Sequence, residues 1–564
     1  MRYGVFDIES ENWIRFKVLG FFDGEDYKTF DSPRKFLQYI DRKAYDGFPL
    51  YAHNGGKFDF LFLLDDLFRM ASLKLIERQG RIIEVTAKLP RGNVLHFRDS
   101  YALLPSSLKK LGEAFKVRHQ KTSYEFKEGA KVKVTQRLLK YLEQDCLCLH
   151  EVIDTFFGQD FIGQPQLTIA SQALNTFRTK FLDGELYQVS EPLEDEFRDN
   201  FYSGGRVEVF KGEGTVNVYD VNSLFPSVMC EEMPGGVPKR VRTYVRDRIG
   251  FYSVNITRTP NFYIPPYLFK VESGQYRKNF FVNGPGQYYL SSAMLNALRE
   301  DYGVRFTVNY GYVFPERKHI FNDYVNFFFK IKHDHKDDAQ GAVAKLFLTS
   351  LYGKFAAHRW RESIETYRGQ EEWRIPESPA LQEFGLVLVE RESKSKFILP
   401  YLAAYITDLA RLKHWRMMQE APDHCFYCDT DSIFTTATYK HTRKLGDLDL
   451  KGRFKAVFLS AKSYALKNAK EERVIFKGFK PEKFSFRDFQ EALHDGRLLE
   501  SEETRILSFR ESLNRKSAVE ESQGKFLNLV KVHKAVKNVY DKRKMLFGGK
   551  HFFDTKAYTW KEKA

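Results

Sequence analysis

Cysteine is scarce in this chain of 564 residues, and its apolar runs are short. An odd, scattered set of cysteines argues against a disulfide framework and for a reducing compartment. The five are Cys146, Cys148, Cys230, Cys425 and Cys428. No stretch approaches the length of apolar chain, roughly 20 residues, that spans a bilayer. A strand carrying carboxylates follows Met1 almost directly, which leaves no room for a leader peptide and predicts a cytoplasmic protein that is not secreted.

Negative charge is in deficit, since 89 Lys and Arg accompany 74 Asp and Glu for a formal net charge of +15. About half of the excess lies in residues 522–564, which hold eleven Lys or Arg against three Asp or Glu. A basic balance favours a polyanionic partner, although charge alone also fits a merely basic soluble protein. Most of the 52 Phe and 31 Tyr must be core, but some could stack on bases.

One stretch, residues 424–434, predicts two strands joined by a tight turn, because apolar and aromatic residues flank Asp-Thr-Asp-Ser. Asp429 and Asp431 should lean to the same side, since side chains repeat every second residue in extended backbone. Two carboxylates held so close repel each other unless a cation lies between them, which favours a divalent metal for phosphoryl transfer. A bare Asp-x-Asp is more often a polar turn. Cys425-x-x-Cys428 lacks a second pair, so we interpret it as packing.

Carboxylates also follow two predicted strands near the amino terminus. Residues 2–10 predict a strand with Asp7 and Glu9 on one face. A second short strand ends near Asp59, which leads into a helix-like apolar run over 60–64. Each pattern alone is common in proteins of many functions.

A third carboxylate element is the helix that the periodicity of residues 135–156 predicts. Tyr141 and Asp145 lie one turn apart on it and so share a side. Four carboxylates on three elements can hold two metals and activate water against a phosphodiester. They are Asp7, Glu9, Asp59 and Asp145.

The order Asp-x-Glu, Asn-x-x-x-Phe-Asp and Tyr-x-x-x-Asp resembles the three motifs of the proofreading 3′→5′ exonuclease domain of family B DNA polymerases. That domain has a ribonuclease-H-like fold. The stretch 107–111, Ser-Leu-Lys-Lys-Leu, and Lys127 are similar to motifs of the protein-primed branch, found in phages, adenoviruses and linear plasmids. The resemblance implies that Lys127 assists catalysis. It also implies that the frayed primer end is held by His53, Asn54, Phe58, Ser107, Leu108 and Tyr141.

Two adjacent glycines follow at Tyr202-Ser203-Gly204-Gly205. Glycines let backbone approach another surface closely, and the plain alternative is a turn. The stretch resembles the Tyr-x-Gly-Gly motif that lies between the exonuclease and polymerase modules of the family. By that resemblance Tyr202, Gly204 and Gly205 contact template.

Residues 216–227 predict a strand that carries Asp220 into a turn and the start of a helix. Asp220 is the natural third carboxylate to face the Asp429–Asp431 hairpin. The backbone amides at Ser223, Leu224 and Phe225 could cradle triphosphate oxygens. The match to motif A of family B is close, with Phe225 in place of the more usual Tyr. Its ring could still exclude a ribose 2′-OH, but any role of a phenol hydroxyl is lost.

Residues 326–359 turn helical and basic. Lys345 and Tyr352 lie two helical turns apart and share a face, which suits the phosphates and the sugar of an incoming nucleotide. The plain alternative is an amphipathic helix that ends at Gly353. The stretch resembles motif B, with Thr349 where Asn is usual.

Beyond the Asp hairpin, Lys462-x-Tyr464 resembles the family's Lys-x-Tyr motif, which implies that Lys462 steadies the primer terminus. The basic tail after residue 522 would grip duplex phosphates as a thumb, with a solvated face as the alternative.

The resemblance implies a multidomain α/β and α+β fold in which a ribonuclease-H-like exonuclease domain precedes a right-hand polymerase with two insertions. For the insertion at 358–398, a surface hairpin with no task is an equally good interpretation. The predicted division is exonuclease 1–160, palm 161–232 and 399–510, first terminal-protein-region-like insertion 233–322, fingers 323–357, second such insertion 358–398, and thumb 511–564.

The predicted function is DNA-templated DNA synthesis with intrinsic 3′→5′ proofreading. Asp220 and Asp431 would bind two Mg²⁺ or Mn²⁺ ions with Asp429 as support, and the four exonuclease carboxylates would bind two more. The expected partners are primer-template and single-stranded DNA, dNTPs and a terminal priming protein, with the enzyme a monomer that also displaces strands. Three alternatives stay open: a replicase of this fold that needs no primer, one primed by oligonucleotides, and a catalytically inactive DNA-binding remnant.

Overall fold

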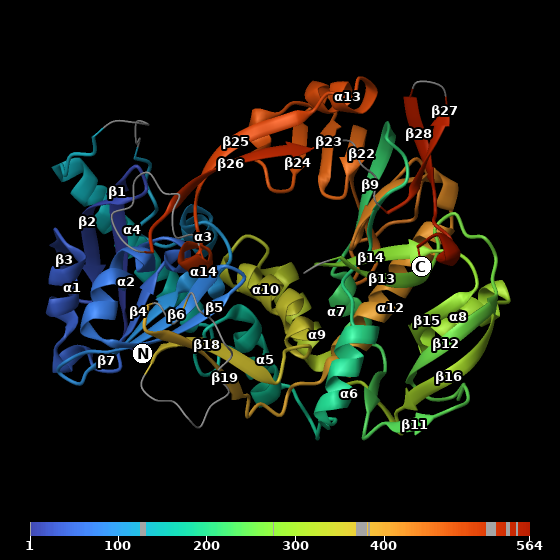
Figure 1. Cartoon of the computed structure of the whole chain (residues 1–564), viewed down its shortest axis with the longest axis horizontal. Helices are drawn as coiled ribbons and strands as arrows, with labels where there is room; N and C mark the ends of the chain where they lie inside the picture. The colour runs from blue at the N-terminus through green and yellow to red at the C-terminus, as the bar shows by residue number, and fades with distance from the viewer. Residues whose placement is uncertain are drawn as a thin grey trace.

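The computed structural model describes residues 2–124, 131–273, 276–367, 381, 384–514, 526–536, 542–548 and 551–563. Two large sheets dominate it, one of nine strands and one of seven. The nine-stranded sheet and its helices lie at one side of Figure 1 (mostly blue, with β18 and β19 in gold), and the C-terminal strands arch across the top toward the other side. Within the described ranges, no helix is both long enough and apolar enough to cross a membrane.

The N-terminal sheet gathers strands from two distant parts of the chain. They are β1 (Gly4–Glu11), β2 (Arg15–Phe22), β3 (Tyr27–Phe30), β4 (Pro49–Ala52), β5 (Ser72–Arg78), β6 (Arg81–Lys88), β7 (Val94–Asp99), β18 (Trp360–Thr366) and β19 (Leu386–Glu392). Their order is β19-β18-β5-β6-β7-β4-β1-β2-β3. β4 pairs in parallel with both β1 and β7. β1 therefore lies between β4 and β2, and its backbone is hydrogen-bonded on both sides.

Helices around this sheet hold their apolar faces against it. They are α1 (Pro33–Ile40), α2 (Asp59–Met70), α3 (Leu108–Phe115) and α4 (Gln136–Phe157), with 3₁₀ turns η1 (Lys43–Tyr45), η2 (Gly55–Lys57) and η3 (Ser100–Ala102). The Thr135 side chain caps α4 by accepting from the Leu138 amide at 3.3 Å. α4 contacts β1 and β2 with Leu138, Leu142 and Cys146 fully buried. Asp145 lies on this same buried side.

The hairpin β18–β19, which falls in the predicted second insertion, extends the N-terminal sheet. Ile364 pairs with Leu75 and Glu365 with Lys74. The Leu73 amide also donates to Thr366 Oγ1 at 3.0 Å, across 293 positions of sequence. β18 is thus joined to β5 in the N-terminal sheet, and β19 forms the edge of that sheet.

The central sheet carries the Asp hairpin. Its strands are β8 (Val207–Val209), β9 (Glu213–Val221), β20 (Cys425–Asp429), β21 (Ser432–Thr435), β22 (Leu448–Ser460), β23 (Ser463–Lys467) and β24 (Glu472–Phe476), in the order β24-β23-β22-β9-β21-β20-β8. On β9, Tyr219 and Val221 join the core that includes α12 (Pro400–Gln419), whereas Val216 and Val218 join a second core on the other face. The alternation places Asp220 on the face of Val216 and Val218.

The region between the two palm segments forms smaller elements. They are β10 (Met233–Gly235), β11 (Lys239–Val241), β12 (Gly250–Arg258), β13 (Tyr267–Ser273), β14 (Tyr276–Val282), β15 (Gly286–Ser291), α8 (Ser292–Tyr302), β16 (Arg305–Val313) and β17 (Glu316–Lys318). The helices α9 (Asn322–Asp334) and α10 (Ala339–Lys354) pack on each other, and α10 also contacts α5 (Ile169–Lys180) and α7 (Leu224–Met229). Shorter helical pieces are α6 (Glu191–Glu196), the π-helical turn η4 (Phe197–Phe201), η5 (Pro422–His424) and η6 (Pro481–Lys483).

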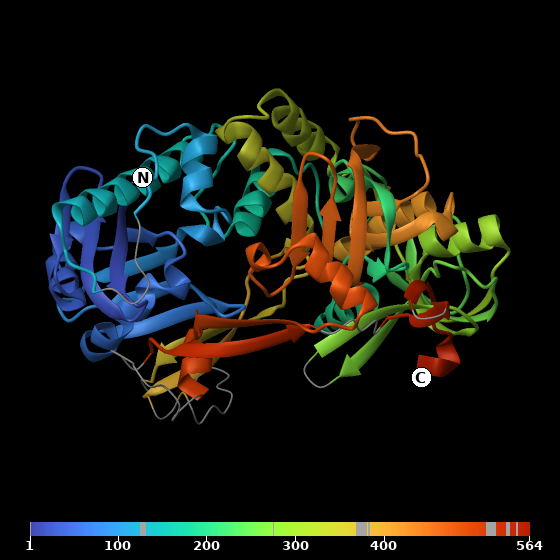
Figure 2. The ribbon, with the colours of Figure 1, turned by 90° about the horizontal axis from the view of Figure 1, so that it is seen from above.

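The C-terminal elements bridge the two large sheets. They are α13 (Phe486–His494), β25 (Leu499–Ile506), α14 (Phe509–Asn514), β26 (Leu529–Val536), β27 (Lys544–Gly548), β28 (His551–Lys556) and α15 (Trp560–Lys563). At one end, Phe509 and Phe526 belong to the core of the N-terminal sheet, where Phe526 lies 4.9 Å from the Phe68 ring. At the other end, Leu499 shares a core with Phe489 of α13 and with Val457 of β22. Figure 2 shows β25 and β26 running between the two sides.

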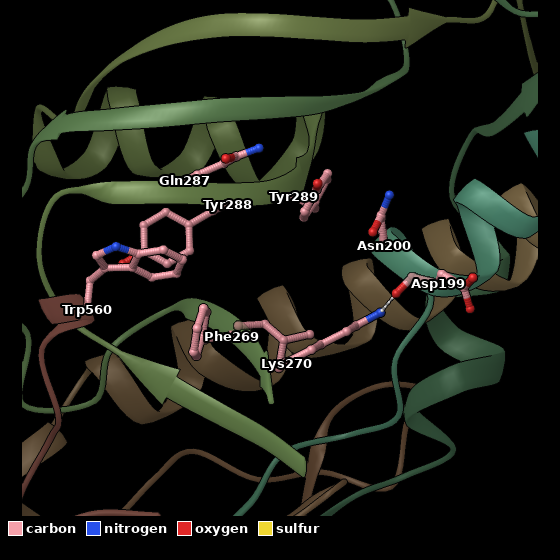
Figure 3. A pocket seen from close by; sticks show the side chains of 9 residues that line it. Asp199, Asn200, Phe269, Lys270, Gln287, Tyr288, Tyr289 and Trp560 are labelled. Atoms are coloured by element: carbon pink, nitrogen blue, oxygen red, sulfur yellow. Dashed lines mark hydrogen bonds between the residues drawn. The ribbon is translucent and has the colours of Figure 1, made fainter. Parts of the chain in front are cut away.

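The last described helix, α15, docks on the 233–318 region. The Trp560 amide donates to the Asn283 carbonyl at 2.8 Å, and the indole covers Gly286, where a Cβ would come within 2.7 Å of it. A cavity of about 430 Å³ opens beside Trp560 (Figure 3). In the cavity the Lys270 ammonium donates to the Asp199 carbonyl. The contacts of Trp560 with Asn283, Gly286 and Phe269 join α15 to the β13–β15 region.

Candidate active sites

The first site gathers the four N-terminal carboxylates. Asp7 and Glu9 lie on β1 and Asp145 on α4, and one oxygen from each lies within 4.8 Å of the other two. Asp59, the first residue of α2, accepts a hydrogen bond from the Ile8 amide at 3.0 Å, which seats it against β1 beside Asp7. The structure thus brings together all four residues that the sequence predicted.

The carboxylates of this cluster repel one another in a buried place. Burial and then the Asp145 charge raise the pKa of Asp7 to about 7. Burial and then the charges of Asp7 and Asp145 raise the pKa of Glu9 to about 9. Burial and then Asp7 also raise the pKa of Asp59. Asp145 Oδ1 is buried with no hydrogen-bond partner among the described residues. Such a set of oxygen donors fits divalent cations like Mg²⁺.

A lysine that the sequence interpretation missed, Lys121, closes the first site. Its ammonium contacts Asp145 Oδ2 and donates to Tyr141 Oη at 2.9 Å. Although burial opposes it, the charges of Asp145 and Asp7 raise the pKa of Lys121 and keep it protonated. Lys127, the lysine that the resemblance had pointed to, lies outside the described residues. Lys121 stands in an irregular segment, so no periodicity marks it.

The predicted primer-holding residues surround this cluster unevenly. Phe58 is half-buried and precedes Asp59, and Asn54 is exposed with a positive φ of 66°. His53 is engaged internally, with Nδ1 3.0 Å from Ser100 Oγ and Nε2 2.8 Å from the Ser106 carbonyl. Burial lowers the pKa of His53 to about 4, so the ring is neutral.

Ser107 and Leu108 stand at the start of α3. Ser107 caps the helix by accepting from the Lys110 amide at 3.4 Å. Leu108 is buried to 7% exposure in the core, so its side chain offers little surface to a ligand. A role of this pair in binding DNA stays a prediction.

In the absence of divalent metal, the protein is expected to lose stability as the pH rises from about 5 to 9. Asp7 and Glu9 have folded-state pKa values of about 7 and 9, above the unfolded values near 4. Between those values the folded state holds protons that the unfolded state has released, so the free energy of unfolding falls as pH rises. A difference of one in pKa between the two states corresponds to about 1.4 kcal/mol of that free energy. Thermal unfolding in EDTA at several pH values measures the slope.

Two controls test the source of this slope. Glu9→Gln, which removes one of the titrating groups, should flatten it, and Mg²⁺ at pH 8 should restore stability to the wild type. An unchanged slope in Glu9→Gln would assign the effect to other groups.

The second site lies at the turn between β20 and β21. Thr430 occupies the turn with a positive φ of 63°. The Val221 amide donates to the Asp431 carbonyl at 2.7 Å, and Ser432 pairs in register with Asp220. β9 therefore brings Asp220 beside the turn. Burial and then the charge of the neighbouring Asp220 carboxylate raise the pKa of Asp431 to about 6.

Asp429, the other carboxylate of the turn, has a basic partner. Both of its oxygens lie 2.7 Å from Lys462 Nζ. Tyr427 Oη donates to Asp429 Oδ2 at 3.2 Å and accepts from the Lys462 amide at 2.9 Å. The Tyr464 ring packs 5.0 Å from that of Tyr427. The predicted Lys462-x-Tyr464 pair is thus built onto the hairpin.

The Tyr-x-Gly-Gly stretch packs directly on this turn. The Thr430 amide donates to the Arg206 carbonyl at 2.7 Å. A Cβ on Gly205 would come within 2.6 Å of the Thr430 methyl and 2.9 Å of its Cα, whereas a Cβ on Gly204 would meet nothing within 4 Å. Tyr202 is half-buried at the start of the stretch. Gly205 is therefore required for close approach, and Gly204 is not.

Gly205→Ala is expected to lower polymerisation by about 100-fold and to leave 3′ trimming unchanged. The new methyl must push Thr430, and displacement of reacting groups by about 1 Å costs on that order. Gly204→Ala is the matched comparison, because its methyl would meet no protein atom within 4 Å and so leaves Thr430 in place, and it should lose less polymerisation than Gly205→Ala. Primer extension and single-strand degradation by each variant measure both effects. Equal losses in the two variants would contradict the packing explanation.

A basic and aromatic surface faces Asp220. The Phe225 and Tyr352 rings stack at 4.4 Å and 11°. Lys332 Nζ donates to Ser223 Oγ at 2.8 Å, and Lys345 on α10 is exposed. Burial and then the charges of Lys345 and Lys451 lower the pKa of Lys332. Three lysines thus share one locality with a carboxylate, which suits a bound polyphosphate.

Lys332 is a second residue that the site prediction omitted, although it lies in the basic run that the sequence shows. Leu224 is buried at 2% exposure, so only its backbone can serve a ligand. Ser223 stands just before α7 with a positive φ of 56°. Thr349 Oγ1 donates to the Lys345 carbonyl at 3.0 Å, a hydrogen bond within its own helix.

These features together define a polymerase fold with a nuclease-like domain at its amino terminus and one carboxylate site in each part. Phi29 DNA polymerase in a ternary complex with primer-template DNA and incoming nucleotides shares this fold, with a TM-score of 0.73 and 21% identity over 95% of this chain and 99% of that one. The phi29 DNA polymerase complexed with single-stranded DNA gives a TM-score of 0.68 at 22% identity over 86% and 94%. The predicted fold class is confirmed.

The chain belongs to the family described as DNA polymerase type B, organellar and viral, whose model matches residues 41–135 and 122–378. It is 28% identical over 471 residues to the DNA-directed DNA polymerase of Enterobacteria phage PRD1 (77% of this chain, 76% of that one) and 29% identical over 461 residues to the DNA polymerase of Bacillus phage phi29 (74% and 75%). A probable DNA polymerase of Ascobolus immersus is 28% identical over 495 residues. The match covers 74% of this chain and 41% of that relative, so the chain spans about two fifths of the fungal protein. The resemblance drawn from the motifs is confirmed.

Proposed function

We propose that this protein is a DNA-templated DNA polymerase with a 3′→5′ exonuclease of its own. The observation that carries the proposal is the presence of two separate carboxylate clusters. One lies between β1 and α4, and the other lies where β9 meets the β20–β21 turn. Family membership and the names of the phage relatives support the same conclusion.

In synthesis, Asp220 and Asp431 would hold two Mg²⁺ or Mn²⁺ ions, which when bound stabilise the attacking and leaving oxygens of the phosphoryl transfer. Lys345 and Lys332 neutralise the triphosphate charge. The stacked rings of Phe225 and Tyr352 offer a flat wall to the sugar of the incoming dNTP.

Two further groups act on the primer and the template. Lys462, held on Asp429, places a positive charge close to the Asp431 side of the turn and steadies the primer terminus. The Tyr202-x-Gly204-Gly205 stretch contacts the template from the other side of Thr430. These roles follow the resembled family, and the packing of Gly205 on the turn supports them.

In proofreading, Asp7, Glu9, Asp59 and Asp145 would hold the metals that activate water against the terminal phosphodiester. Lys121 takes the part that the resemblance gave to Lys127, because its ammonium is directed at Asp145 and Tyr141. Held there, it places a positive charge where the scissile phosphate develops negative charge.

Protein priming is the initiation mode that we propose, with a terminal protein docked on the 233–322 region, and the domain division of the sequence analysis is kept with it. The enzyme would act as a monomer in the cytoplasm of the host. Resemblance to the phage branch supports this mode. Formation of a covalent link between a candidate terminal protein and dAMP or another nucleotide tests it. dNTP incorporation on naked circular single strands would instead favour a polymerase that needs no primer, and extension from oligonucleotides without any such link would favour an oligonucleotide-primed replicase.

One experiment tests both activities. A labelled primer-template is incubated with Mg²⁺, with and without dNTPs. Extension with dNTPs and shortening without them are expected. Absence of both from folded protein would reduce the chain to a DNA-binding remnant and overturn the proposal.

A further inference from the structure

The turn between β1 and β2 holds a bulky residue in a left-handed backbone conformation. Asn12 and Trp13 follow each other with positive φ angles of 51° and 66°. This left-handed region is uncommon for any residue other than glycine, and for a bulky residue it is a genuine outlier. Residues held in such conformations cluster at functional sites.

The strained turn buries the smaller apolar side chain and exposes the larger one. Ile14 is 1% exposed and belongs to the core of the N-terminal sheet, and its amide donates to the Glu11 carbonyl at 3.3 Å. Trp13 is 64% exposed, more than any other large apolar side chain among the described residues. Burial of apolar surface favours the opposite arrangement. Stability of the fold therefore does not explain where Trp13 points.

The position of Trp13 relative to the first site suggests what it is for. The indole meets the Phe58 ring edge-to-face at 5.8 Å, and Phe58 directly precedes Asp59. Trp13 also follows β1, the strand that carries Asp7 and Glu9. An exposed indole thus stands at the rim of the carboxylate cluster, next to a second aromatic ring.

We propose that Trp13 is a stacking platform for a base of the single DNA strand whose 3′ end lies at the carboxylate cluster. Every base has a π-face, so stacking on an aromatic side chain holds a strand without sequence preference. The inference rests on the proposed exonuclease function and adds to it a residue outside the motifs named in the sequence analysis. Trp13 is a binding residue, and Phe58 keeps its indole in place.

Binding is tested in an Asp145→Ala background, where the strand is bound but not cut, with a 10-nucleotide oligo-dT as the probe. Trp13→Ala should weaken binding by roughly 5- to 150-fold, the range expected for the loss of one stacked base. Trp13→Phe keeps a ring and should recover most of the affinity. Tyr367→Ala is the matched control, since Tyr367 is a comparably exposed aromatic residue, at 60%, just after a different strand. It should bind like the parent.

Kinetics separate a binding role from a structural one. With an otherwise wild-type chain, Trp13→Ala should raise KM for single-stranded DNA and leave kcat, the melting temperature and primer extension from paired ends unchanged. Affinity equal to the parent in Trp13→Ala, or a loss confined to kcat, would overturn the inference. If the wild type degrades DNA and Trp13→Ala degrades it with the same KM, only this inference fails. If the wild type degrades none, the proposed exonuclease function fails instead.

Discussion

Asp431→Asn is expected to lower primer extension by about 10³-fold or more while leaving 3′ trimming at the wild-type rate. Asn keeps the shape of the side chain and removes the charge that the pair with Asp220 needs in order to hold a divalent cation. Removal of even one hydrogen-bond donor from a transition state costs roughly 10² to 10³ in rate, and loss of a metal ligand should cost at least as much. Single-nucleotide incorporation under rapid mixing measures the effect.

A neighbouring carboxylate provides the control. Asp449 lies opposite Asp220 in the β9–β22 pairing, and its Oδ2 lies 2.6 Å from Lys451 Nζ. Asp449→Asn changes the local charge equally but should lower extension only a few-fold. If Asp431→Asn removed both extension and trimming from folded protein, the assignment of separate sites would be wrong.

Local patterns were enough to predict the carboxylate elements. Asp429 and Asp431 could be placed at a hairpin because strand side chains alternate, and Tyr141 and Asp145 could be placed together because helix residues four apart share a side. The structure has these elements over β20–β21 and α4. That Asp220 meets the hairpin follows from strand pairing, which the sequence suggested only through the order of the motifs.

Long-range packing could not be predicted in the same way. Ile364 pairs with Leu75, although nothing in the two sequence segments indicates that they are neighbours. The pairing forms because β5 has an edge to which β18 can add. Phe509 and Phe526 fall in stretches predicted as palm and thumb, yet their rings complete the core of the N-terminal sheet. The hydrophobic character of a residue indicates that it is usually buried, but it does not indicate which other element it packs against.

The two residues to which we assign new roles, Lys121 and Trp13, could not be predicted for a related reason. Lys121 has no periodic context, and its role is visible only from its contact with Asp145. Trp13 lies outside the motifs named in the sequence analysis, and its positive φ angle and the exposure of its indole are seen only in the structure.

Asp145→Ala is expected to abolish 3′ trimming, by about 10³-fold or more, and to leave primer extension at the wild-type level. Asp145 is the carboxylate that α4 contributes to the cluster, and its Oδ1 is buried without a hydrogen-bond partner among the described residues, so it is available to a metal. Degradation of a labelled single strand, followed over hours with Mg²⁺, measures the loss. Misincorporated primers should then persist and be extended.

The same substitution also removes the partner of Lys121, so a change in stability must be kept apart from a change in chemistry. Loss of the Asp145 charge relieves the repulsion that raises the pKa of Asp7 and Glu9, whereas Lys121 loses its main ion pair. These effects oppose each other. Asp145→Asn, which keeps the shape and a hydrogen-bond acceptor for Lys121, should lose trimming as fully as Asp145→Ala. Retention of trimming in folded Asp145→Asn would show that the charge of Asp145 is not needed, and the metal-holding role of the cluster would then have to be abandoned.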